Sequence, residues 1–189
     1  MKKVKYIIAL LSVSIFLSTL NGVSAQGKYI DKNGKITFEA SEELFEPVRA
    51  KNESVTVIIN TETSEIASLA LMKSFRFKNS LMEEHFNENY IESEVYPKAT
   101  FKGKLLDFNF SDLTENAQSI EVDGTLELRG KEKKIRTTLN VNKSSDGFII
   151  IKGSFVVTPQ DFDIDIPSVV RNKIAKEIIV SLDFKLSKR

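Results

Sequence analysis

The stretch that decides the fold is Ile120–Asn142, IEVDGTLELRGKEKKIRTTLNVN. On both sides of Gly130, small or apolar residues alternate with polar ones. Ile120, Val122, Gly124, Leu126 and Leu128 come before the glycine, and Ile135, Thr137, Leu139 and Val141 come after it. A period of two is typical of a strand with one buried face. The stretch therefore predicts two half-buried antiparallel strands joined at Gly130.

The chain that follows continues in the same way. Phe148–Thr158 is predicted to be a strand, and a period-two pattern runs from Ile178 to Leu186. Between them, Ser168–Glu177 is expected to form a short helix because Pro167 stands near its start.

The chain before Ile120 also contains predicted strands. Lys28–Ile30 and Lys35–Ala40 flank Asn33-Gly34, a dipeptide typical of a hairpin turn. Val55–Asn60 and Glu65–Lys73 carry apolar residues on both faces, so we expect these strands to be central or covered on both sides.

The predicted elements indicate an all-β protein. The pattern holds about eight or nine strands with little room for crossover helices, which favours an antiparallel sandwich or a closed barrel. Closure removes exposed strand edges, and this favours the barrel. We find no internal repeat or linker, so residues 26–189 are expected to form a single domain.

Residues 1–25 have the pattern of a signal peptide. Three lysines precede the apolar run YIIALLSVSIFLSTL, and Val23-Ser24-Ala25 supplies the small residues that signal peptidase requires. The apolar run is shorter than the roughly 20 residues of a spanning helix. We therefore expect cleavage near Ala25, no membrane-spanning segment in the mature chain, and a periplasmic or secreted location.

Composition excludes several functional classes. The chain has 27 basic and 26 acidic residues. Residues 1–25 hold three lysines and no acid, so residues 26–189 have 24 basic and 26 acidic residues, a net charge of −2. This balance argues against a general nucleic-acid binder, which needs a clustered basic excess. Cysteine is absent, which excludes a lipid-modified cysteine, disulfides, thiol catalysis and thiolate metal sites.

The most distinctive segment is Phe75–Leu105, FRFKNSLMEEHFNENYIESEVYPKATFKGKL, which contains the single histidine. Ser80–Glu83 has the form of a capping box at the start of a helix. A turn at Glu94–Pro97 and a strand from Ala99 follow. Helical spacing places five residues on one face: Leu81, Met82, His85, Phe86 and Tyr90.

This segment resembles the compact, secreted members of the YceI-like family. The resemblance is carried by Ser80–Tyr90 and Tyr96–Gly103, and more weakly by Gly124–Gly130 and Ile166–Ala175. The chain departs from the family pattern after Gly130, where Lys-Glu-Lys stands in place of Val-Thr-Lys. The resemblance implies a lipocalin-like barrel with one or two short helices. It also implies that the apolar interior holds a polyisoprenoid or similar amphipathic lipid, with no cofactor and no catalysis.

The resemblance also suggests which residues contact the ligand. His85 and Tyr90 would stand at the rim. Ordinary core packing remains the alternative for each apolar residue, because small barrels are often filled. The sequence also leaves a homodimer open. The expected wall residues are Phe38, Leu71, Phe75, Phe77, Met82, Phe86, Phe101, Leu126 and Phe155.

Other chemistries fit the sequence less well. His85 has no second histidine at helical spacing for a metal, and no Gly-x-Ser-x-Gly motif supplies a nucleophile. The aspartates from Asp161 to Asp165 begin like a calcium loop, but Ile166 and Asn172 stand where glycine and glutamate are required. We expect these aspartates on a charged edge strand, with the apolar residues between them facing inward.

Three hypotheses follow. The first is a lipid-binding barrel, and the second is a structural or partner-binding barrel with a filled core. The third and weaker one is an isomerase or hydrolase that acts on a hydrophobic substrate.

Lys131, Lys133 and Lys134 form a basic turn that would either meet a phosphate head group or lie in solvent.

Overall fold

The computed structural model describes residues 27–41 and 47–189. The signal peptide expected in residues 1–25 lies outside the described residues. The strands are β1 (Lys28–Ser41), β2 (Arg49–Asn60), β3 (Glu65–Leu71), β4 (Arg76–Phe77), β5 (Lys98–Leu105), β6 (Gln118–Leu128), β7 (Lys131–Lys143), β8 (Ile149–Val157) and β9 (Ile174–Lys188).

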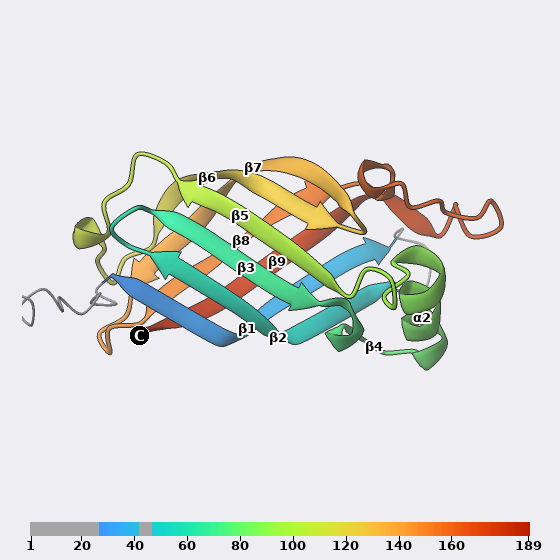
Figure 1. Ribbon diagram of the computed structural model, residues 1–189, viewed down its shortest axis with the longest axis horizontal. Coiled ribbons are helices and arrows are strands. Elements are labelled where there is room, and N and C mark those ends of the chain that lie inside the picture. The colour runs from blue at the N-terminus through green and yellow to red at the C-terminus, as the bar shows by residue number, and fades with distance from the viewer. Residues whose placement is uncertain (1–26, 42–46) are drawn as a thin grey trace, which may run out of the picture.

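The strands form a closed barrel. Hydrogen bonding runs in the order β1-β9-β8-β7-β6-β5-β3-β2, and an antiparallel β1–β2 pairing closes the circle. The short β4 pairs with β2 only near the start of that strand. The result is the eight-stranded antiparallel barrel that the alternating pattern predicted, and Figure 1 shows its tilted strands.

One helical segment lies across one end of the barrel. The helix α2 (Ser80–His85) continues directly into a π-helical turn, η2 (Phe86–Tyr90). The segment between β8 and β9 lies at the same end, whereas the C-terminus lies at the other (Figure 1). Three 3₁₀ turns complete the structure: η1 (Met72–Ser74), η3 (Phe110–Asp112) and η4 (Pro159–Phe162). Among the described residues, no helix is long and apolar enough to cross a bilayer.

The helix begins one residue earlier than the predicted capping box. Asn79 is the N-cap, and its side-chain oxygen accepts a hydrogen bond from the amide of Leu81 at 2.9 Å. Glu83 reaches back past the N-cap, where it accepts from the amide of Phe77 at 3.1 Å and pairs with Arg76. The acidic residue therefore anchors the helix to β4, and Ser80 is not the cap.

The hairpin turn predicted at Asn33-Gly34 is wrong, because β1 is one continuous strand with a bulge. Its register against β2 shifts on both sides of Gly34, which is not at positive φ. The Asp31 carboxylate accepts from the amide of Asn33 at 2.8 Å and from that of Lys185 on β9 at 2.8 Å. A bulge bends the strand and increases its twist, so the residues that resemble a turn instead curve β1 around the barrel.

One further expectation is wrong. Residues 168–173 form turns instead of a helix, and Ile174 already pairs with Ser41 of β1. β-branched residues such as Val169 and Val170 lose side-chain freedom in a helix. Of the two alternatives for β2 and β3, the first is confirmed, because each strand pairs with a neighbour on both edges. Their outer faces are not covered, since Ile58, Leu69 and Leu71 are exposed.

The half of the barrel away from α2 is filled with side chains. Its inward-facing residues include Val57, Leu105, Val122, Val141 and Ile151, each at most 1% exposed. The other half, beneath α2, contains a cavity.

Candidate functional site: the cavity beneath the helix

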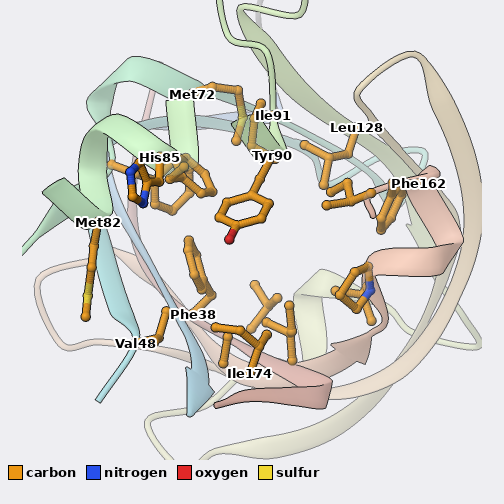
Figure 2. A pocket seen from close by; sticks show the side chains of 18 of the residues that line it. Phe38, Val48, Met72, Met82, His85, Tyr90, Ile91, Leu128, Phe162 and Ile174 are labelled. Carbon is orange, nitrogen blue, oxygen red and sulfur yellow. The ribbon is translucent and has the colours of Figure 1, made fainter. Parts of the chain in front are cut away.

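The cavity has a volume of about 570 Å³. Its walls come from the ends of the barrel strands nearest α2, from the helix, and from the segment between β8 and β9, as Figure 2 shows. Leu81, His85 and Lys173 line it and are also exposed, so they mark its mouth. The remaining lining is almost entirely apolar.

Contacts among four phenylalanine rings attach the helical segment to the barrel wall. The Phe86 ring of η2 lies 5.4 Å from that of Phe38 on β1, 5.8 Å from that of Phe75 and 5.1 Å from that of Phe77 on β4. All four rings line the cavity. Aromatic pairs at such distances contribute about 0.5–1.5 kcal/mol each beyond the area they bury. The rings therefore both form the cavity wall and hold its cover in place.

The helix face predicted from the sequence is the face that lines the cavity. Leu81, Met82, His85, Phe86 and Tyr90 all contribute. The Tyr90 hydroxyl points into the middle of the space (Figure 2). Burial raises the pKa of Tyr90, so the phenol stays protonated at neutral pH and can both donate and accept a hydrogen bond.

Few polar groups line the cavity. Asn79 and Thr158 use their side chains to cap α2 and η4 respectively. Within the described part of the chain, no side-chain hydrogen bond or ion pair engages Tyr90, His85 or Lys173. These three groups are therefore placed to contact the oxygen atoms of a bound amphiphile.

Ion pairs join three segments at one side of the mouth. Arg129, after β6, pairs with Glu92 beyond η2 and donates to the Asp163 carbonyl at 2.6 Å. Lys131 pairs with the Asp163 carboxylate at 2.6 Å, and Lys133 pairs with Asp161. The basic turn thus binds two aspartates of its own chain.

These aspartates are more acidic than usual. The Lys131 ammonium holds the pKa of Asp163 below its ordinary value of 3.8. Burial on its own would raise the pKa of Asp161, but hydrogen bonds from Lys133 and from the Thr158 amide outweigh burial and lower it. The edge strand expected here is wrong, since η4 and irregular chain replace it. Its apolar residues nevertheless face inward, with Phe162 buried and Ile164 and Ile166 lining the cavity.

Most of the expected wall residues lie together. Leu71 does not line the cavity; it is 49% exposed because it follows the inward-facing Ala70 and so points outward. Phe101 does not line the cavity either; its ring packs against the core next to it. The structure brings together Phe38, Phe75, Phe77, Met82, His85, Phe86, Tyr90, Leu126 and Phe155. Their contact with a ligand stays a prediction.

The sequence interpretation missed other lining residues. Leu128, Ile178 and Val180 share the inward alternation of β6 and β9, so the period-two pattern was sufficient to find them. Met72 begins the short turn η1 and Ile91 directly follows η2, so neither belongs to an element long enough for its periodicity to identify them. In residues 27–41 and 47–189, no group of three or more histidine and carboxylate residues is placed to hold a metal.

Comparisons with known proteins agree with this architecture. A polyisoprenoid binding domain from Saccharophagus degradans has a TM-score of 0.74 and 16% identity, covering 86% of this chain and 99% of that chain. BcnA of Burkholderia cenocepacia has a TM-score of 0.62 and 14% identity, covering 81% and 96%. The YCEI protein of Campylobacter jejuni has a TM-score of 0.56 and 16% identity, covering 72% and 81%.

At these identities the structural likeness shows the fold alone. No curated protein matches the chain. The profile of the YceI-like domain matches residues 28–186, nearly the whole of the described chain. The protein therefore belongs to the YceI-like family.

Proposed function

We propose that this protein binds a polyisoprenoid or similar amphipathic lipid, with the apolar tail in the barrel and the polar end at the mouth. The observation that carries the proposal is the apolar cavity of about 570 Å³ in a barrel whose other half is tightly filled. Pockets for small molecules typically measure about 300–1,000 Å³. The polyisoprenoid binding domain of similar fold supports the ligand class.

Hydrophobic burial would drive binding. Each methylene removed from water contributes about 0.8 kcal/mol, so a tail of ten such groups gains roughly 8 kcal/mol before the costs of association. The three polar groups at and inside the mouth, Tyr90, His85 and Lys173, would orient the head of the ligand. We propose a carrier or scavenger with no chemistry of its own, which acts in the periplasm or outside the cell; the signal-peptide pattern of residues 1–25 supports that location.

The filled structural barrel is the second candidate. The cavity counts against it, because about 570 Å³ exceeds the space of a few waters at roughly 30 Å³ each. For an enzyme acting on a hydrophobic substrate, the third candidate, the acid–base group we would test first is His85, which lies exposed at the mouth. Replacing His85 with alanine would abolish activity in that case and would leave a carrier's lipid uptake nearly intact.

The test is mass spectrometry of an organic extract from the protein, produced from the full chain and purified without detergent. We expect a co-purified lipid, or stoichiometric uptake of an added polyprenol. A clean extract together with no uptake would overturn the proposal.

A further inference from the structure

Phe101 lies at the boundary between the cavity and the filled half of the barrel. Ala99, two residues earlier on β5, lines the cavity, whereas Leu105, on the same face of the strand, is 1% exposed in the filled half. Phe101 is partly buried and contacts both groups of core residues, the main core and the smaller group around Phe162. Along β5, the Phe101 ring therefore separates the cavity from the filled half of the barrel.

The Phe101 ring rests on two glycines. Gly103 of β5 and Gly124 of β6 face each other across the sheet. A Cβ atom placed on Gly103 would lie 2.8 Å from Cζ of Phe101, and one on Gly124 would lie 2.4 Å from it. Neither glycine is at positive φ. A Cβ atom on Gly103 would also lie 2.6 Å from the Asp123 carbonyl oxygen, and one on Gly124 2.6 Å from the Lys102 carbonyl oxygen. Both the close backbone and the ring therefore exclude a side chain at these positions, and the ring occupies the niche that the glycines leave.

The same level of the barrel shows two similar arrangements. The Phe184 ring covers Gly34, where a Cβ atom would lie 2.8 Å away, and the Leu139 side chain covers Gly153 at 2.5 Å. Phe184 and Leu139 are 2% and 3% exposed. Phe101 is only partly buried, so its ring is the least enclosed of the three side chains.

We infer that Phe101 is the floor of the cavity and sets the longest tail that the barrel accepts. This inference rests on the proposed lipid-binding function. Without the ring, the niche above Gly103 and Gly124 has no side chain to fill it, and the cavity deepens toward Leu105. Phe101 would therefore determine specificity for chain length without contacting the head of the ligand.

The test measures the affinities of wild type and Phe101→Ala for linear prenols that differ by one isoprene unit. In wild type, affinity should rise with length and then level off where the tail meets Phe101. In Phe101→Ala the rise should continue, with at least about tenfold tighter binding of the first prenol beyond the wild-type limit. Phe148→Ala is the matched control, since Phe148 lies beneath the Lys185 ammonium in the turn before β8, at the far end of the barrel.

The outcomes separate the two proposals. If wild type binds no prenol, the proposed function and this inference both fail. If wild type has a length limit that Phe101→Ala does not move, the inference alone fails. If Phe101→Ala does not fold, Phe101→Trp still tests the inference, because its larger ring should reduce the prenol length at which affinity levels off. Equal loss of binding at every length in both variants would show a purely structural role and would also overturn the inference.

Discussion

Arg129 and Glu92 form an ion pair beside the mouth of the cavity, and both residues hold left-handed backbone, with φ of 50° and 55°. Asp163, whose carbonyl accepts from the same guanidinium, is left-handed as well, with φ of 54°. Such a backbone is uncommon for residues other than glycine. Three separate chain reversals therefore meet at one arginine, which joins the end of the helix, the turn after β6 and the segment after η4.

Replacing Arg129 with alanine should destabilise the protein by about 1.5–3 kcal/mol, the range for hydrogen bonds to charged groups. It should also speed the release of a bound prenol, since the helix and the η4 segment lose their shared anchor. Urea unfolding and a dye-displacement off-rate measure the two effects.

The control for that prediction is Arg136→Ala, which removes the exposed pair between Arg136 and Glu121 on the outside of the barrel. Exposed pairs contribute about 0–1 kcal/mol, so stability and release should hardly change. Equal effects of the two substitutions would contradict the role assigned to Arg129.

The ion pairs of Asp161 and Asp163 should make stability depend on acid pH. Both aspartates have a lowered pKa in the folded protein, so their contribution is fully present above the ordinary value of 3.8 and is lost as the pH falls through the folded values. Urea unfolding should be measured from pH 6 downward for wild type and Asp161→Asn. The difference between their free energies of unfolding should shrink below about pH 4. A difference that persisted at the lowest pH would contradict this account.

Tyr90→Phe should leave stability within about 0.5 kcal/mol of wild type, because the hydroxyl points into the cavity and has no hydrogen-bond partner among residues 27–41 and 47–189. Prenol binding should weaken by about 2–12-fold if the prenol oxygen bonds that hydroxyl, the range for one net hydrogen bond. Titration of both proteins with the same prenol measures this. Tyr29→Phe, at the far end of β1, is the matched control, and a loss as large there would exclude a specific contact.

Phe86→Ala should destabilise the protein by about 2–4 kcal/mol, since it removes the ring that contacts Phe38, Phe75 and Phe77. Prenol affinity should fall as well, because the helix loses its attachment to the wall. Thermal unfolding and titration check the two effects. Leu81→Ala is the control: Leu81 is 54% exposed on the same helix and its loss should cost under about 1 kcal/mol. A smaller loss for Phe86 than for Leu81 would contradict the anchoring role.

Local patterns predicted much of the fold and part of the site. The alternation around Gly130 correctly identified β6 and β7, and helical spacing correctly grouped Leu81, Met82, His85, Phe86 and Tyr90 on one face. Both patterns depend only on backbone geometry, which repeats every two residues in a strand and every 3.6 in a helix. The Asn33-Gly34 interpretation failed because a turn and a bulge use the same residue types, and only the pairing partners distinguish them.

The sequence by itself determined most of the strands, the apolar face of the helix and the family resemblance, because these follow from local periodicity and short motifs. The tertiary structure decided which end of the barrel is hollow. That outcome depends on whether a side chain lies over a glycine on a neighbouring strand, as the Phe101 ring lies over Gly103 and Gly124. It also decided that Arg129 would meet Glu92 and Asp163, residues that are distant in sequence and adjacent only after the barrel closes.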